Sequence, residues 1–360
     1  MTAVRALLAC TLLLGCTGRA APILIGTAGP WKEGFGARTR EGVEMAVAEI
    51  NRRGGVRGRR LELVARDDDA DGAKAVAIAK EFVETPRLVA VVGHVTSGAM
   101  VAAAKIYDGR LPAVATSATS PDLTGISPWT FRVISSDSTN GLDMARFAAR
   151  LGRHRAAILY ENDSYGRGLA DAFRRSFAGA VVSIDPIAAD MRNFEPYVAF
   201  YRERVPDLVF VAGTEQTGMA LLREARREGL NADFLGGDGW TGVVDDPAAE
   251  GAYVGAPFTP ADPRPEVQQF VRAFRAAYRV DPDGNAALGY DATMLVARAI
   301  ERAGADRGKV RDWLAGLGSH GAFQGITGDI RFRPDGDPIG KSFVMTRVRR
   351  GALVVEGAGR

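Results

Sequence analysis

Residues Leu88–Met100 read LVAVVGHVTSGAM, and the fold of the surrounding chain can be predicted from this stretch. Its first part, Leu88–Val92, is an unbroken apolar run rich in valine, which is typical of a strand buried on both faces of a parallel sheet. Gly93 ends the run, and a helical pattern starts near Ala99. Ser97 therefore occupies the position of a helix N-cap. It is either an ordinary cap or part of an anion site, because free backbone N–H groups and the helix dipole converge there.

A second strand of the same kind follows at Pro112–Thr116, with the sequence PAVAT. It is followed by small residues, most of which bear hydroxyls: Ser117, Ala118, Thr119 and Ser120. Parallel strands that lie side by side end at the same edge of a sheet, and open α/β folds bind ligands at the carboxyl edge. The two strand ends together predict a pocket for a small carboxylate.

The length and composition indicate an ordinary globular protein with two domains. At 360 residues the chain is too long for one small core. It is 46% hydrophobic and 25% charged, and its net charge is only +3. The one basic cluster, Arg57–Arg60, contains no aromatic residue, so we interpret it as a solvated turn. Nothing in this composition predicts nucleic-acid binding.

The N-terminus has the features of an export signal. Ala6–Leu14 is an apolar run that is too short to span a membrane, and it follows a single positive charge. The ending Leu13-Leu14-Gly15-Cys16 resembles the lipobox of bacterial lipoproteins, in which the cysteine becomes the lipidated first residue of the mature protein. An ordinary signal cleaved near Ala20-Ala21 is the alternative. In the lipoprotein case Cys10 is removed with the signal, so no pair of cysteines remains for a disulfide.

Strands and helices alternate along the rest of the chain in two rounds, one from Ile23 to Ile134 and one from Arg155 onward. Each round is about the size of a domain, which predicts two doubly wound parallel α/β sheets. The four aspartates of Asp67–Asp71 lack the spacing of a calcium loop, so we interpret them as a polar turn that caps the next helix. Residues 328–332 and 342–355 are expected to form a β-hairpin around the turn at 334–336.

The chain contains no recognisable catalytic motif. It has neither a GxGxxG after the first strand, nor a GxxxxGK[ST], nor a GxSxG, so dinucleotide, P-loop and hydrolase sites lack their defining loops. Of the three histidines only His94 lies near a hydroxyl, that of Ser97, and we interpret His94 as a structural residue at the strand end. Potential metal ligands are not clustered. We therefore expect binding without catalysis, with no cofactor and no metal.

Further polar and aromatic residues follow strands of the second round, where a cleft between two lobes would be lined. Tyr165 follows the first of these strands, Thr214 and Glu215 follow the strand Leu208–Ala212, and Asp238 follows a short strand at 234–235. Together with the hydroxyls of the first round they supply donors for a carboxylate, a carboxylate for a cation, and an aromatic wall. An α-amino acid requires this set, because its ammonium needs a charged acceptor and its carboxylate needs aligned donors.

Several segments, in their order along the chain, resemble the type I periplasmic binding proteins of the leucine/isoleucine/valine-binding group, which are the solute receptors of ABC transporters. The resemblance covers essentially the whole mature chain. It is carried by GVEMAVAEINRRGGVRGRRLELVARDD (42–68), VVGHVTSGAM (91–100), PAVATSATSPDLT (112–124), YENDSYGRGLA (160–170), LLREARREGL (221–230), FLGGDGW (234–240), GYDAT (289–293) and GDIRFRPDGD (328–337).

The resemblance implies ligand-binding roles for residues of the first lobe and for one acidic residue of the second. Ser97 and Thr119 would hold the ligand carboxylate through hydroxyl and backbone N–H groups. The Ser117 carbonyl, the Thr119 hydroxyl and Asp238 would take the ammonium, and Ala118 would lie in the same binding loop.

The remaining implied contacts include departures from the family pattern. Tyr165 would cover the ligand from the second lobe, and Phe35 lies where the family places an aromatic residue. Thr214 lacks the ring that the family often has at its position, and Asp238 replaces a commoner glutamate. The family's disulfide in the N-terminal lobe is absent, because Ala70 and Thr96 occupy its positions.

The architecture implied by the resemblance is two α/β lobes, each with a doubly wound parallel sheet, joined by a three-strand hinge. A signal and linker at 1–21 would precede an N-terminal lobe at 22–138 plus 267–340 and a C-terminal lobe at 139–266 plus 341–360. The three interlobe crossings would lie near Ser138, Glu266 and Lys341.

The implied function is that of an extracytoplasmic substrate-binding protein. It would capture a branched-chain or other aliphatic amino acid and deliver it to the membrane permease of an ABC transporter. A sensor of the same fold that binds an amide, a short-chain acid or an aromatic acid is the alternative, and the export signal favours the transport receptor. We expect a monomer in the periplasm or cell envelope, anchored to the membrane by a lipid on Cys16.

Overall fold

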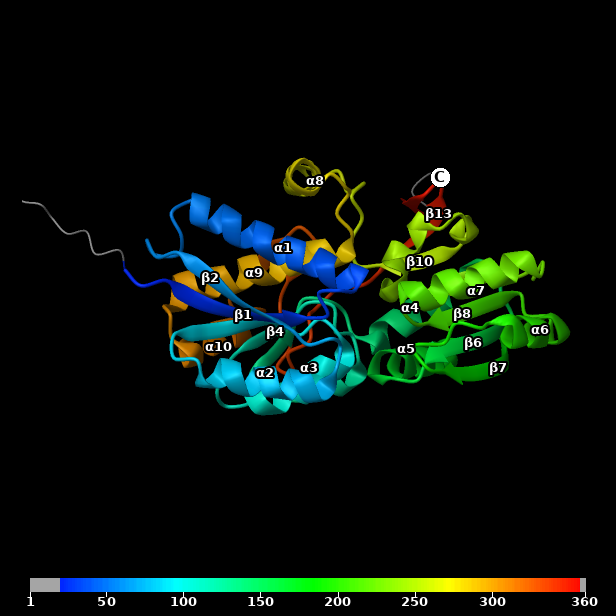
Figure 1. The fold of residues 1–360 in the computed structure, drawn as a ribbon, viewed down its shortest axis with the longest axis horizontal. Helices are drawn as coiled ribbons and strands as arrows, with labels where there is room; N and C mark the ends of the chain where they lie inside the picture. Colours follow the sequence, from blue (N-terminus) through cyan, green and yellow to red (C-terminus); the bar gives the residue numbers. More distant parts are fainter. Residues whose placement is uncertain (1–19, 357–360) are drawn as a thin grey trace, which may run out of the picture.

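The computed structural model describes residues 20–356, which form two lobes lying side by side (Figure 1). Each lobe is a β-sheet with helices packed on both faces. Among these residues no helix combines the length and the apolar character that crossing a membrane requires. The signal segment with Cys16 lies outside the described residues.

The first lobe is built on a sheet of five parallel strands in the order β2-β1-β3-β4-β5. The strands are β1 (Ile23–Gly29), β2 (Leu61–Asp67), β3 (Leu88–Gly93), β4 (Ala113–Ala115) and β5 (Thr130–Arg132). One face is covered by α1 (Gly34–Arg52), α9 (Gly284–Ala303) and α10 (Arg307–Ala315), and the other by α2 (Gly72–Glu84) and α3 (Ser97–Tyr107). Helix α8 (Pro265–Tyr278) packs outside α1 and α9 (Figure 1). Strand β3 is therefore buried along its whole length, as its apolar run predicts.

The second lobe has a sheet of seven strands in the order β14-β13-β10-β9-β8-β6-β7. Five are parallel: β6 (Arg155–Glu161), β7 (Ala180–Ile187), β8 (Leu208–Ala212), β9 (Asp233–Gly236) and β10 (Tyr253–Ala256). Two antiparallel strands, β13 (Val344–Arg349) and β14 (Ala352–Val355), extend one edge. Helices α4 (Asp137–Arg150) and α5 (Ser164–Ser176) cover one face, and α6 (Glu195–Arg204) and α7 (Glu215–Arg227) cover the other.

The chain passes between the lobes three times, and we call these passages crossings. The first crossing runs from β5 to α4, the second from β10 to α8, and the third from β12 (Gly328–Ile330) to β13. A two-stranded hairpin of β11 (Phe323–Gly325) and β12 precedes the third crossing. Short 3-10 helices lie at η1 (Pro121–Leu123), η2 (Asp238–Asp245) and η3 (Pro247–Ala249).

Two local predictions are wrong. Residues 328–332 and 342–355 do not pair with each other, because β12 pairs with β11 while β13 pairs with β10 and β14. The local turn does form, with a bridge between Phe332 and Pro338 and a hydrogen bond from the Arg333 N–H to the Asp337 carbonyl, but β13 beyond it pairs with the open edge of the second sheet. Helix α3 begins at Ser97 rather than near Ala99, so the N-cap is Thr96 and Ser97 is the first helical residue.

His94 is a structural residue, as expected, and it fixes the start of α3. Its ring is fully buried, with Nδ1 2.6 Å from Asp68 Oδ2 and Nε2 3.1 Å from the Tyr107 hydroxyl. These contacts tie the end of β3 to the turn after β2 and to the far end of α3. In the same turn, the Asp71 side chain caps α2 by accepting from the Lys74 backbone N–H at 2.7 Å, which confirms the predicted polar turn.

Candidate functional site

A cavity of about 440 Å³ lies between the lobes, at the carboxyl ends of the strands. Residues after β1, β3 and β4 line it from the first lobe, and residues at or after the ends of β6, β7, β8 and β9 line it from the second. Two of the eight predicted ligand residues, Ala118 and Thr119, are fully buried and do not line the cavity. The other six do: Phe35, Ser97, Ser117, Tyr165, Thr214 and Asp238.

The hydroxyl of Ser97 joins the ends of β3 and β4. It accepts hydrogen bonds from the backbone N–H groups of Thr119, at 3.2 Å, and Ser120, at 3.1 Å. A serine hydroxyl has two acceptor lone pairs and one donor hydrogen. Both lone pairs are occupied here, so the hydrogen is left to donate to a group in the cavity.

The first turn of α3 opens onto the same part of the cavity, where Thr96, Ser97 and Gly98 line the wall. The Thr96 side chain does not cap the helix. The first N–H groups of a helix have no intrahelical partner, and the positive end of the helix dipole lies beside them. This end of the cavity is therefore suited to a carboxylate.

Thr119 is placed differently from the role that the resemblance implied. Its backbone N–H is directed to Ser97, so it is not free to bind a ligand in this structure. Its hydroxyl is buried and makes no hydrogen bond within residues 20–356. The Thr119 side chain does not line the cavity but lies beside the buried carboxyl group of Asp137, whose pKa it helps to lower.

Asn285 connects the first lobe's binding loop, Ser117–Ser120 (hereafter the ligand loop), to the second lobe. The Ser117 hydroxyl donates to Asn285 Oδ1 at 2.9 Å, and Asn285 Nδ2 donates to the Thr241 hydroxyl in η2 at 3.3 Å. A second contact spans the cleft where Gln216 Nε2 donates to Glu33 Oε2 at 2.7 Å. The lobes are thus already in polar contact around the cavity.

Tyr165 and Asp238 form the wall on the second lobe. The Tyr165 hydroxyl, on α5, donates to Asp238 Oδ1 at 3.0 Å and accepts from the Gly239 backbone N–H at 3.1 Å. Asp238 is only 8% exposed, so its carboxylate is largely removed from water. The tyrosine therefore fixes the orientation of Asp238, which is the charged one of the three predicted acceptors for a ligand ammonium.

Two buried carboxyl groups lie close together behind this wall. Burial raises the pKa of Asp238 from its ordinary 3.8 to about 6, and the hydrogen bond from Tyr165 opposes that rise. Asp137, in the first turn of α4, is fully buried, and burial together with the negative charge of Asp238 raises its pKa well above the ordinary value. Buried like charges are unfavourable, so a cation bound in the cleft would stabilise the ionised form of Asp238.

Thr214 serves as an anchor for a buried carboxylate at the end of β6. Glu161 is 1% exposed, and its Oε1 accepts from the Thr214 backbone N–H at 2.9 Å, from the Thr214 hydroxyl at 2.7 Å and from the Thr217 hydroxyl at 2.5 Å. These three bonds offset the cost of burying the charge. Thr214 thus holds the start of α7 against β6, and it contributes no ring to the cavity.

The remaining wall combines apolar side chains with another carboxylate. Pro30, Phe35 and Val95 give the cavity an apolar side. Glu215 lies among them at the start of α7, and its pKa is raised to about 7, first by burial and then by the charges of Asp283, Asp245 and Glu33. A ligand here meets an apolar surface beside acidic groups.

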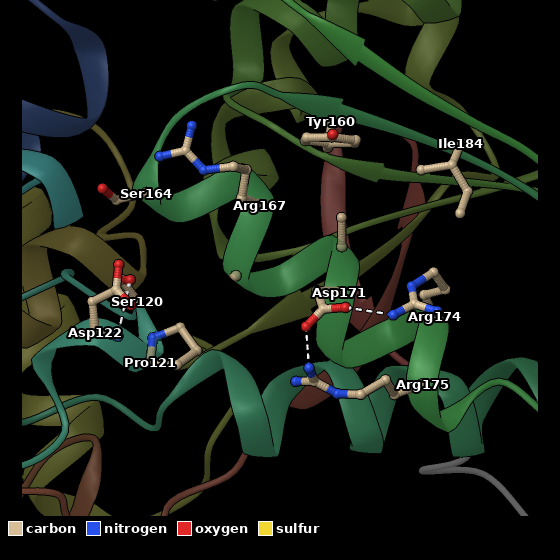
Figure 2. Close-up of a pocket in the computed structure, with 12 residues that line it drawn as sticks. Ser120, Pro121, Asp122, Tyr160, Ser164, Arg167, Asp171, Arg174, Arg175 and Ile184 are labelled. Carbon is tan, nitrogen blue, oxygen red and sulfur yellow. Dashed lines mark hydrogen bonds and ion pairs between the residues drawn. The ribbon is translucent and has the colours of Figure 1, made fainter.

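A second cavity, of about 530 Å³, lies between η1 of the first lobe and α5 of the second (Figure 2). Three of its charged side chains pair with one another at the surface: Asp171 forms ion pairs with Arg174, at 2.8 Å, and with Arg175 (Figure 2). Exposed pairs of this kind contribute little energy. The 440 Å³ cavity is therefore the better candidate site, because the buried carboxyl group of Asp238 and the unpaired hydroxyl of Thr96 line only that one of the two.

Sequence reasoning missed three residues of this site. Glu161 lies at the end of one strand and Glu215 follows the end of another, a position that favours a place in a ligand site. Neither was assigned a role from the sequence. No local pattern marks Asn285, because it lies on a helix and its partner Ser117 is 168 residues away in the sequence.

Comparison with known proteins gives consistent results. A family model described as periplasmic binding protein matches residues 22–352. An amino acid binding protein of Pseudomonas aeruginosa is 32% identical over 327 residues, which cover 85% of this chain and 86% of that protein. The leucine-, isoleucine-, valine-, threonine-, and alanine-binding protein of the same organism is 31% identical, with 84% and 83% covered. A solved ABC transporter substrate-binding protein from Desulfitobacterium hafniense, in complex with Leu, is 34% identical with a TM-score of 0.82, and 93% of this chain and 100% of that chain are covered.

Asp238→Asn should stabilise the ligand-free protein. A folded pKa of about 6, above the ordinary 3.8, means that the charged carboxylate is less favourable in the folded state than in the unfolded chain. At about 1.4 kcal/mol per pKa unit, the variant should gain about 2–3 kcal/mol in unfolding free energy above roughly pH 7. The gain should shrink as the pH falls through about 6 and vanish below about pH 4, where the carboxyl is protonated in both states.

Urea unfolding of ligand-free wild type and variant at both ends of this pH range measures the difference. Asp190→Asn is the control, because that carboxylate lines the same cavity but is exposed, and it should change stability by less than about 0.5 kcal/mol. An Asp238→Asn protein that is less stable than the wild type above pH 7 would contradict the conclusion that the buried Asp238 carboxylate destabilises the ligand-free protein.

Proposed function

The chain belongs to the periplasmic binding protein family, and we propose that it captures a branched-chain or other aliphatic amino acid between its lobes and delivers it to the membrane permease of an ABC transporter. It is a binding protein and not an enzyme. The ligand class is supported by the relatives: one is named for leucine, isoleucine, valine, threonine and alanine, and one solved relative holds Leu.

The observation that carries the proposal is the convergence of three kinds of groups on one cavity. Ser97 and the first turn of α3 offer donors for a carboxylate, and Asp238 offers a buried acceptor for an ammonium. Phe35 and Val95 offer an apolar surface for an aliphatic side chain. A zwitterionic amino acid satisfies all three at once, whereas a neutral amide or an aromatic acid would leave the carboxylate of Asp238 without a cation.

Capture is proposed to work by hinge closure. We assign the N-terminal lobe to 22–138 plus 267–340 and the C-terminal lobe to 139–266 plus 341–360, with crossings near Ser138, Glu266 and Lys341. A ligand that touches Ser97 on one lobe and Asp238 on the other binds the closed arrangement better than the open one, so it shifts the population toward closure. The permease would then recognise the closed form.

The ligand class is tested by titration calorimetry of the protein against the twenty amino acids. We expect at least one to bind with micromolar or better affinity. Asp238→Ala should weaken that ligand by about 1.5–3 kcal/mol, the range for hydrogen bonds to charged groups. Asp171→Ala, in the second cavity, should leave the affinity unchanged.

Failure of every amino acid, together with binding of an amide, a short-chain acid or an aromatic acid, would overturn the proposed ligand class and favour a sensor of the same fold. Equal losses in Asp238→Ala and Asp171→Ala would contradict the choice of cavity.

We also propose that the protein is a monomer held at the cell envelope by lipid on Cys16. The support is the sequence Leu13-Leu14-Gly15-Cys16 after a short apolar run. A single acyl chain binds a membrane only marginally, so more than one chain is required for stable anchoring.

Lipidation is tested by growing bacteria that express the full chain in radiolabelled palmitate. The wild type should incorporate the label and sediment with membranes. Cys16→Ser should lose both properties, and Cys10→Ser should keep both because that residue lies within the removed signal. A wild type that incorporates no label would refute the anchor and favour an ordinary cleaved signal, and label retained in Cys16→Ser would refute Cys16 as the lipidated residue.

A further inference from the structure

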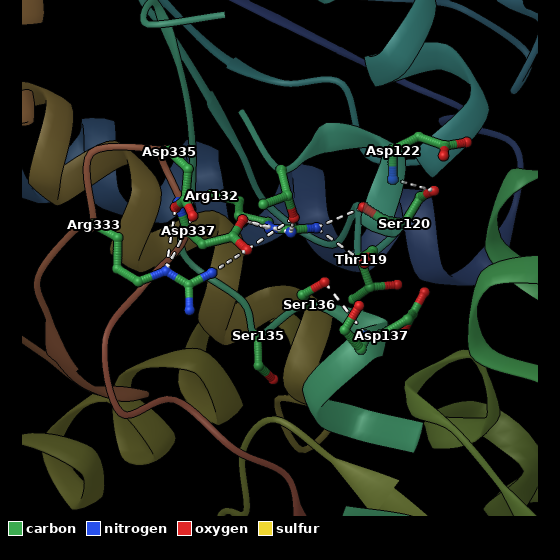
Figure 3. A network of polar contacts seen from close by, with 12 residues as sticks. Thr119, Ser120, Asp122, Arg132, Ser135, Ser136, Asp137, Arg333, Asp335 and Asp337 are labelled. Carbon is green, nitrogen blue, oxygen red and sulfur yellow. Dashed lines mark hydrogen bonds and ion pairs between the residues drawn. The ribbon is translucent and has the colours of Figure 1, made fainter. Parts of the chain in front are cut away.

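A single buried guanidinium lies directly behind the ligand loop. Arg132, the last residue of β5, is 2% exposed. Its Nη1 donates to the carbonyls of Thr119, at 2.9 Å, and Ser120, at 2.8 Å (Figure 3). Thr119 and Ser120 also donate their backbone N–H groups to the Ser97 hydroxyl, so both the carbonyl and the N–H groups of this segment are hydrogen-bonded.

The other edge of the guanidinium is bound to the segment that leads into the third crossing. Arg132 Nε donates to Asp337 Oδ1 at 2.6 Å, and the Asp337 side chain is itself buried (Figure 3). The Thr124 hydroxyl bridges the pair, because it accepts from Arg132 Nη2 at 2.7 Å and donates to Asp337 Oδ2 at 2.9 Å. Arg333 also donates to Asp337 Oδ2, at 3.0 Å.

The first crossing reaches the same point. The backbone N–H of Asp137, at the start of α4, donates to the Thr119 carbonyl at 2.9 Å. That carbonyl therefore accepts from Asp137 on the first crossing and from Arg132, which is held by the segment before the third. The first crossing thus contacts the backbone of Thr119 directly, and the third reaches it through Asp337 and Arg132.

The geometry of this network is specific to arginine. The planar guanidinium fork donates in one plane to two carbonyls on one side and to a carboxylate on the other, whereas a lysine ammonium cannot reach both sides together. The charge is also matched locally by the carboxylate of Asp337, which is hydrogen-bonded to the guanidinium.

We propose that Arg132 is a positioning residue for ligand binding. It holds Thr119 and Ser120 in the conformation in which Ser97 can donate to the ligand carboxylate, and through Asp337 it couples that conformation to the third crossing. This inference rests on the proposed function, because the ligand it positions for is the amino acid. Arg132 itself does not line the cavity, so it acts only through the ligand loop.

Arg132→Lys tests the positioning, and Arg307→Lys is its matched control. Arg307 also donates to three backbone carbonyls of the first lobe, those of Val83, Thr85 and Leu88, but it does so at the opposite end of β3. Asp337→Asn tests the coupling, because Asp337 makes no hydrogen bond to the ligand loop among the described residues. Each protein is measured for amino-acid affinity, for thermal unfolding, and for hydrogen exchange of the Thr119 and Ser120 amides without ligand.

We expect Arg132→Lys and Asp337→Asn to raise the Kd at least tenfold and to accelerate exchange of the two amides. Arg307→Lys should lower the melting temperature while leaving the Kd and these amides unchanged. Arg132→Lys with wild-type affinity and exchange, or an equal loss of affinity in Arg307→Lys, would overturn the positioning role. If Asp337→Asn keeps the wild-type Kd and exchange rates while Arg132→Lys does not, the coupling to the third crossing is refuted. If the wild type binds no amino acid, the proposed function fails, and the exchange rates still decide whether Arg132 holds the loop.

Discussion

The site depends on the two hydrogen bonds that Thr119 and Ser120 donate to the hydroxyl of Ser97. They join the ends of β3 and β4, which would otherwise be separate loops, into one surface. They also determine the chemistry of that surface, because a serine whose lone pairs are both occupied can act toward a ligand only as a donor. The start of α3 beside it adds unpaired N–H groups of the same character. His94 holds the end of β3 in place through its contacts with Asp68 and Tyr107.

The second lobe supplies a hydrogen-bond acceptor, Asp238, and burial of this carboxylate lowers the stability of the ligand-free protein. Asp238 is buried, and its pKa is raised to about 6 before any ligand is present. A buried carboxylate without a cation destabilises the folded protein. An ammonium that binds beside it removes this destabilisation, and the free energy so recovered favours binding. Donors on one lobe and an acceptor on the other mean that neither lobe alone satisfies a zwitterion. Under the proposed function, closure of the lobes and recognition of the ligand would therefore be one event.

The fold could be predicted from the sequence because its signals are local. Apolar runs such as Leu88–Val92, helical stripes and strand-end hydroxyls depend only on near neighbours, and the structure has β3 and α3 close to where they were expected. The features that were missed are pairings between distant residues. Ser117 meets Asn285 168 positions away, and Arg132 meets Asp337 205 positions away, and neither pair leaves a mark in the local pattern. The predicted hairpin near the C-terminus was wrong for the same reason, since β13 pairs with β10, a strand distant in the sequence.

The central claim is that one zwitterion bridges the two lobes between Ser97 and Asp238. It is tested most directly by a crystal structure of the protein with the tightest-binding amino acid. The account predicts a ligand carboxylate within hydrogen-bonding distance of Ser97 Oγ and an ammonium within hydrogen-bonding distance of the Asp238 carboxylate. A ligand seated between η1 and α5, or one in the cleft whose ammonium lies away from Asp238, would contradict it.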